Sequence, residues 1–301
     1  MDNYARFPVI KIPMPKDITI TLPFKDADRE TELRALSEKE TDFTVAEKAA
    51  LCTVSFAASE LAKYLSKISK VNILYATKGK EVGGFIIDIS FDGAPKSECG
   101  YSIAPLKNGV SLYGKGRVGA LYAVYDFLYA QGIRWYYPGD EGEEIPIGKT
   151  MLAVSEHPVE STPDMSAGRG LDIFAPLKDS EVFLYWMARN RMNMTADHVY
   201  TAALGDKLGM TFRVGGHMFR PLLLPDKPLS NGKTIWEAHP EWYGLPESGV
   251  REKARVLKNQ FCVSRPDLVD YLSDIIIKRL KKEWNHVDRR RAYKLKCGHF
   301  I

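Results

Sequence analysis

Residues 108–129 restrict the fold more than any other stretch, because they join a turn, a strand, a glycine cluster and an apolar helix pattern. Asn108-Gly109 separates SIAPL from VSLY, and Asn-Gly between apolar runs is typical of a tight β-hairpin. After the glycines, apolar residues recur every three or four positions from Val118 to Tyr129. The sequence therefore predicts an antiparallel strand pair followed directly by a helix that packs on the sheet.

The glycine cluster GKGRVG also matches the dinucleotide-binding pattern G-x-G-x-x-G, with Asp140 about twenty residues further on. One interpretation is a nucleotide-dependent oxidoreductase that binds its cofactor through Gly114, Gly116 and Gly119. The strand before these glycines is, however, the second arm of a hairpin. We therefore favour the structural alternative, in which glycine permits a sharp turn and close packing of the helix.

The flanking segments predict a two-layer α/β domain over residues 1–157, with a sheet that is at least partly antiparallel. Strand-like runs occur at VIKIP, DITITLPF, NILYAT, GGFIIDISF, IRWYYPG and KTMLAV. The run at 46–68 has apolar residues at helical spacing and predicts an amphipathic helix.

From Met165 onward the pattern changes to alternating strands and helices. SAGRGLDIF, MTADHV, MTFRVGG and NQFCVS are strand-like, and EVFLYWMARNRM, ALGDKLG and DLVDYLSDIIIKRLKKEW are helical. Asp179-Ser180 and Ser264 are the expected helix caps. Alternation of this kind builds a (β/α)8 TIM-type barrel, but only about four units fit before the chain ends. We expect residues 158–301 to be the first half of an incomplete barrel, truncated near 284.

Several runs resemble known glycan-active proteins. NGVSLYGKGRVGALYAVYDFLYAQGIRWYYPGDEGEEIP resembles the N-terminal accessory domain of family 67 α-glucuronidases, of family 20 β-hexosaminidases, and of an uncharacterised bacterial family related to both. RGLDIF, WMARNRMN, RVGGHMFRPLLLP, AHPEWYGL and NQFCVSRPD are most similar to the uncharacterised family. The resemblance covers residues 60–284 and implies an accessory α/β domain before a glycoside hydrolase barrel.

The resemblance also implies a sugar site at the carboxyl ends of the barrel strands. Its candidate substrate-binding residues are Arg169, Asp172, Asn193, His217, His239 and Trp242. Each has a structural alternative: an Arg169–Asp172 salt bridge, a helix end capped by Asn193, or a turn at His217. His239 and Trp242, with their neighbours Glu241 and Tyr243, could equally belong to a packed proline turn.

Glycosidic cleavage needs a positioned carboxylic acid and a second carboxylate or a substrate acetamide. The acids at 140–144 precede the expected barrel and read as a solvated loop or an interdomain contact, and the tail 285–301 has neither strand nor helix periodicity. The catalytic residues are therefore unknown, and we expect this chain alone to be inactive. The function expected is that of a glycoside hydrolase-like protein acting on a glycan that contains uronic acid or amino sugar; the alternative is a non-catalytic carbohydrate-binding protein.

The composition and charge also indicate which kinds of partner to expect. The net charge is only +4, from 42 basic and 38 acidic residues, so nucleic acid and membrane are not expected partners. The four cysteines form no C-x-x-C pair, so we expect reduced, buried thiols. No two histidines are spaced as His-x-x-x-His, so no metal site is expected. We expect no cofactor. We expect the chain to self-associate through the incomplete barrel, and to be cytoplasmic unless a leader peptide was removed.

Overall fold

The computed structural model describes residues 7–95, 98–165, 168–171, 177–196, 202–213, 222–254 and 261–280. The chain divides into two compact units, Met1–Arg213 and Val214–Phe300. The boundary that the sequence predicted, between residues 157 and 158, stays a prediction.

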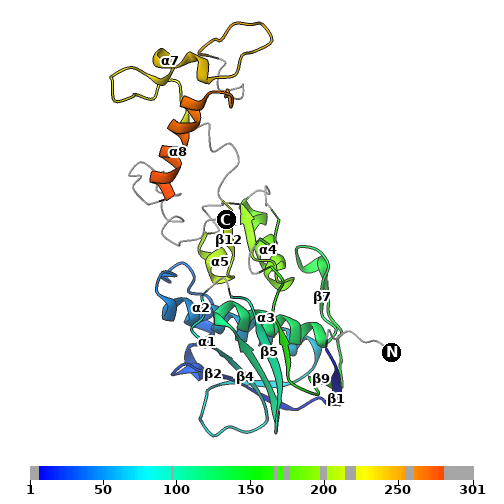
Figure 1. The fold of residues 1–301 in the computed structure, drawn as a ribbon. Helices are drawn as coiled ribbons and strands as arrows, with labels where there is room; N and C mark the ends of the chain where they lie inside the picture. The colour runs from blue at the N-terminus through cyan, green and yellow to red at the C-terminus, as the bar shows by residue number, and fades with distance from the viewer. Residues whose placement is uncertain are drawn as a thin grey trace. The chain divides into compact units, whose positions relative to one another are not determined.

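A six-stranded mixed sheet forms the base of the first unit (Figure 1). Its order is β10 (Val159–Ser161), β5 (Tyr101–Leu106), β6 (Gly109–Gly114), β4 (Phe85–Phe91), β2 (Asp17–Leu22) and β3 (Asn72–Thr77). β5 and β6 are antiparallel, which confirms the predicted hairpin. On its other side β6 runs parallel to β4, so the sheet is mixed around this strand. Ile18, Ile20 and Leu22 of β2 are fully buried, as their alternation predicts.

Three helices pack with this sheet: α1 (Ala27–Ala35), α2 (Ala46–Ile68) and α3 (Gly116–Ala130). α2 coincides with the predicted amphipathic helix. The sequence did not predict α1, because the charged stretch that contains it has no apolar stripe. α3 is buried on nearly every side, since it contacts the sheet and α2 and also touches α4 of the following region. A helix that is apolar all round needs such a position.

Two short ladders complete the α/β region. β1 (Val9–Pro13) pairs antiparallel with β9 (Met151–Ser155), which confirms two predicted strands. β7 (Arg134–Trp135) pairs with β8 (Glu143–Glu144), and the single turn η1 (Asp140–Gly142) lies between them. The predicted strand IRWYYPG is thus reduced to two paired residues.

The glycine cluster is packed against backbone. A β-carbon on Gly114 would lie 1.9 Å from the amide nitrogen of Ala120, and one on Gly119 would lie 2.2 Å from the carbonyl oxygen of Gly100. Gly116 has a φ of 69°, a left-handed conformation that favours glycine. These contacts supply a complete structural reason for the three glycines, in line with the interpretation that the sequence favoured over a dinucleotide site.

The β/α region begins as predicted. Gly170 forms a parallel bridge with Met194, the first residue of β11 (Met194–Ala196), and β11 pairs in parallel with β12 (Thr211–Arg213). α4 (Leu177–Arg189) and α5 (Ala202–Lys207) connect these segments. The expected cap at Asp179-Ser180 is wrong, because α4 begins before it. Closure into a (β/α)8 barrel stays a prediction.

The second unit contains α7 (Ile235–Ala238), η3 (Pro240–Trp242) and α8 (Pro266–Leu280). Its small core comprises Leu222, Leu223, Ile235, Trp242, Tyr243, Leu268 and Leu272. Phe261 of the predicted strand NQFCVS forms an isolated antiparallel bridge with Tyr243, so the described part of this run does not pair as a parallel barrel strand. α8 starts with Pro266 at its first position, where the missing N–H costs nothing, and Arg265 rather than Ser264 precedes it.

Cys52 and Cys99 are buried thiols, as predicted, whereas the Cys262 thiol is partly exposed. Across the described segments, none of the helices has both the length and the apolar character that a membrane crossing requires. The tail 285–301, on which the expectation of truncation partly rested, lies outside the described residues.

Candidate functional site

The second unit brings three potential metal or sugar ligands together at the HPEWYG turn. Thr234 caps the start of α7 in a reciprocal capping box with Glu237. The helix ends at Ala238, and the chain turns at His239, directly before Pro240. The N–H of Cys262 donates a 2.8 Å hydrogen bond to the carbonyl oxygen of Trp242. This bond holds the turn against the segment that leads into α8. HPEWYG and the described part of NQFCVSRPD are therefore neighbours in space.

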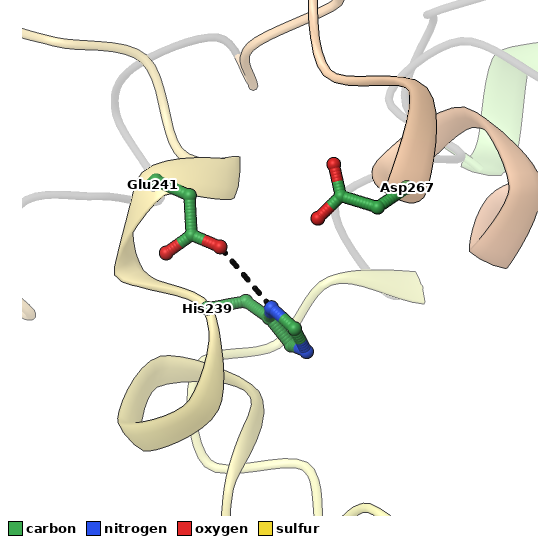
Figure 2. A group of neighbouring side chains, drawn as sticks. All are labelled: His239, Glu241 and Asp267. Carbon is green, nitrogen blue, oxygen red and sulfur yellow. Dashed lines mark hydrogen bonds and ion pairs between the residues drawn. The ribbon is translucent and has the colours of Figure 1, made fainter.

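His239, Glu241 and Asp267 form the centre of this site, and Figure 2 shows the Asp267 carboxylate turned toward the other two side chains. Nδ1 of His239 lies 3.1 Å from Oε1 of Glu241. One ligand atom from each of the three residues lies within 4.8 Å of the other two. The group contains an imidazole nitrogen and two carboxylates, the donor types that bind transition metals or hydrogen-bond hydroxyl groups.

Trp242 positions two of these side chains. Its indole stacks on the imidazole of His239 with ring centres 3.9 Å apart and planes 5° apart. Its indole N–H donates a 2.8 Å hydrogen bond to Oδ2 of Asp267. The residue itself is buried, at 3% exposure. It therefore fixes its neighbours, and the indole face under His239 is covered by protein.

Arg265 sets the electrostatics of the site. Its guanidinium binds both oxygens of Asp267, at 3.1 and 3.2 Å, and lies 3.8 Å from Glu241. The hydrogen bond from Arg265, followed by that from Trp242, lowers the pKa of Asp267 to about 2. Asp267 is thus ionised at all ordinary pH values. It can accept hydrogen bonds or bind a cation, but it cannot donate a proton near neutrality.

Arg169 and Asn193 lie at the amino side of the parallel strands and make mainly structural contacts. The Asn193 side-chain oxygen accepts a 3.2 Å hydrogen bond from the Arg169 backbone N–H, and the Asn193 N–H donates to the Arg169 carbonyl at 2.6 Å. The Arg169 guanidinium donates to the Arg191 carbonyl at 3.1 Å. Asp172 and His217 lie outside the described residues. Sugar binding by these four residues stays a prediction.

A separate cavity of about 450 Å³ lies in the first unit, between α2, α4 and the loop before η1. It is lined by Phe56, Glu60, Lys63, Gly139, Asp140, Val182, Tyr185 and Arg189. The sequence did not point to it, because its walls come from three distant segments. The only sequence signal that could have pointed to this cavity was a charged residue, Arg189, in the predicted helix EVFLYWMARNRM, and its side chain is largely buried in the structure.

A buried ion-pair network forms one wall of this cavity. Nε and Nη2 of Arg189 bind the two oxygens of Glu60 at 3.0 and 3.3 Å, and Nη1 binds Glu143 at 3.0 Å. Glu143 also accepts hydrogen bonds from Tyr64 and, at 3.3 Å, from Lys67. One member of the acidic run 140–144 therefore contacts α4 within the first unit.

The network also shifts pKa values. Burial works to raise the pKa of Glu143, but the Tyr64 hydrogen bond and the charges of Arg189 and Lys67 outweigh it, so the net shift is downward. Burial lowers the pKa of Arg189, and the neighbouring Glu60 carboxylate reverses that shift. Burial raises the pKa of Tyr185 to about 12. At neutral pH the cavity wall is thus charged, whereas Tyr185 is a neutral hydroxyl.

No protein-family model and no curated protein matches this chain. Comparison with solved structures finds glycoside hydrolases of families 115, 20 and 84. A family 20 β-N-acetylhexosaminidase from Streptomyces coelicolor A3(2) shares 12% identity at a TM-score of 0.46, over 93% of this chain and 57% of that one. The N-acetyl-β-hexosaminidase of Streptomyces plicatus shares 13% at 0.44, over 93% and 59%.

A family 115 4-O-methyl-α-glucuronidase with specificity for decorated arabinogalactans shares 12% identity at a TM-score of 0.46, over 78% of this chain and 32% of that one. The chain thus spans less than two thirds of the length of each of these proteins. The likeness is low in both sequence and superposition, so it assigns no activity to the residues described above.

Proposed function

We propose that this chain is a glycoside hydrolase-like protein that binds a glycan containing a uronic acid or an amino sugar. The observation that carries the proposal is the order of elements in the first unit. A mixed α/β domain is followed directly by parallel segments at Gly170, β11 and β12, which α4 and α5 connect. This order is the one implied by the resemblance of residues 108–146 to the accessory domains that precede glycoside hydrolase barrels.

Within this proposal, the cavity between α2 and α4 is the sugar site that the described residues favour. Its volume falls in the range of small-molecule sites, roughly 300–1,000 Å³. Phe56 and Tyr185, whose ring centres are 5.8 Å apart, supply aromatic surface for the C–H face of a sugar ring. Glu60 and Arg189 supply an acceptor and a multiple donor for hydroxyl groups.

The rim of the cavity suits either class of charged sugar. Lys63 is 43% exposed and offers an ammonium to a uronate, while Asp140 offers a carboxylate to an amino sugar. Hydrolysis by this chain alone is not part of the proposal. Glu60 is engaged by Arg189, so it does not provide the free carboxyl of a catalytic pair. The catalytic acids stay unidentified.

The test is to titrate the full chain with glucuronic acid, galacturonic acid, glucosamine and N-acetylglucosamine oligosaccharides, using calorimetry and NMR. We expect saturable binding to one class, with Kd near 1 mM for the shortest ligands, and no release of reducing ends. Tyr185→Ala should weaken binding by roughly fivefold, since an aromatic contact contributes about 1 kcal/mol beyond its area.

Tyr136→Ala is the matched control, because Tyr136 is 63% exposed and does not line the cavity. Circular dichroism on both variants checks that the fold is intact. Equal weakening by the two substitutions would place the sugar elsewhere. A lack of saturable binding to every oligosaccharide tested would contradict the proposed function itself.

A further inference from the structure

We propose that His239, Glu241 and Asp267 bind one divalent transition-metal ion, and that Zn²⁺ is the ion that suits them best. The inference does not depend on the proposed glycan function, since the three residues belong to the second unit. A search for ligand pairs at helical spacing misses this group, because its members come from the end of α7, from η3 and from α8.

The ligand geometry is the first support. Zinc bonds to nitrogen and oxygen ligands are about 2.0–2.2 Å long, so two ligands at the corners of a tetrahedron lie roughly 3.3 Å apart. The 3.1 Å between Nδ1 of His239 and Oε1 of Glu241 is close to that value. Asp267 lies further away, within 4.8 Å, and its side chain is 41% exposed. A small shift of this side chain that keeps its Trp242 hydrogen bond can therefore complete the group.

The donor set is the second support. One imidazole and two carboxylates suit a borderline ion such as Zn²⁺, whereas Ca²⁺ and Mg²⁺ prefer oxygen alone. Three protein ligands leave the fourth tetrahedral position to water or to a ligand from solution. When the metal occupies Nδ1 of His239, the ring carries its proton on Nε2 and remains neutral.

The orienting contacts are the third support. Metal ligands in proteins are usually held by an outer set of hydrogen bonds. Here Trp242 supplies one such hydrogen bond and one ring contact. Its N–H donates to Oδ2 of Asp267, and its ring stacks on the His239 imidazole and fixes the plane of that ring. Oδ1 of Asp267 can then face the ion once Arg265, which now binds it, moves away. The backbone bond between Cys262 and Trp242 ties the two ligand-bearing segments together.

Arg265 is the competitor in this site, and its position gives the proposal a distinctive consequence. Its guanidinium binds Asp267 and lies near Glu241, so it neutralises the same carboxylates that a metal ion would bind. It is 45% exposed, so it can swing toward solvent when a metal binds. Removing this positive charge should tighten metal binding, because like charges at short distance repel.

The experiment is to dialyse the full chain against EDTA, remove the chelator, and titrate with ZnCl₂ by calorimetry while recording tryptophan fluorescence. Metal content after gel filtration gives the stoichiometry. We expect one tight equivalent per chain. His239→Gln and Asp267→Asn should each weaken binding by at least about 100-fold, and Arg265→Gln should tighten it by about tenfold.

Two control variants separate this site from other zinc-binding groups. His157→Gln removes a histidine of the first unit, and Cys262→Ser removes the neighbouring thiol; both should leave the affinity unchanged. Asp267→Asn keeps an acceptor for the Trp242 indole, so it tests the ligand without removing the fold contact. Equal, weak binding in all variants would show an adventitious ion only, and loss of binding in Cys262→Ser would assign the metal to a different ligand set. Either result would overturn the proposal.

Discussion

Replacement of Arg189 by methionine is the perturbation whose cost follows most directly from the structure. Arg189, Glu60 and Glu143 have side-chain exposures of 10%, 6% and 3%, so the guanidinium bridges two carboxylates that water barely reaches. Methionine keeps much of the side-chain volume but removes the charge and the donors. Removing one partner of a buried ion pair typically costs roughly 3–5 kcal/mol, because the remaining charge stays buried without compensation.

Two residual contacts place the expected cost at the lower end of that range. Lys63 lies 3.5 Å from Glu60, and Lys67 lies 3.3 Å from Glu143, and both lysines remain in the variant. We therefore expect Arg189→Met to lower the free energy of unfolding by about 3 kcal/mol at pH 7. A cost of this size is a large fraction of the stability of an ordinary domain.

The loss should also depend on pH with a defined sign. In the wild-type protein the pKa of Glu143 is lowered, so its stabilising contribution is present above the unfolded-state pKa and is lost as pH falls through the folded-state value. Without Arg189, buried carboxylates prefer to be protonated, and acid relieves their burial cost. The difference between wild type and Arg189→Met should thus shrink as pH falls from 7 toward 4.

The assay is urea unfolding followed by circular dichroism at several pH values. The triple variant Glu60→Gln, Arg189→Met, Glu143→Gln serves as the control, because removing all three charges together should recover most of the loss. A cost below about 1 kcal/mol at pH 7, or a cost that does not change with pH, would refute the argument that this network holds uncompensated charge.

Three further predictions follow from single contacts. Gly119→Ala should lower the Tm by several degrees or prevent folding, since its β-carbon would lie 2.2 Å from a carbonyl oxygen, whereas Gly83→Ala, with open space around it, should be close to neutral in a thermal melt. Lys207→Met should destabilise the first unit by about 3 kcal/mol in urea unfolding, because the fully buried ammonium compensates a carboxylate 2.8 Å away. The pKa of Asp267, about 2, should rise toward its ordinary value in Arg265→Gln when followed by carboxyl NMR; its contribution to stability is present above the unfolded-state pKa and is lost as pH falls through the folded one.

The site at HPEWYG shows why residue patterns alone could not predict it. His239 and Glu241 were visible as a pair in HPEWYG, but Arg265 and Asp267 follow some 25 residues later, at the predicted start of the last helix. Trp242 read as either sugar platform or packing residue, and its 3% exposure shows that it is packed. Neither its indole N–H bond to Asp267 nor its stacking on His239 could be inferred from spacing.

The sequence by itself determined the elements whose signal is local. The hairpin at Asn108-Gly109, the helix 46–68 and the glycine turn were predictable because turn geometry and apolar periodicity act over a few residues. Only the tertiary structure decided that β4 runs parallel to β6 on its other side, that Arg189 closes a buried network, and that His239 meets Asp267. Those outcomes depend on contacts between segments far apart in the chain, whose free energies arise from burial and charge pairing that no local pattern encodes.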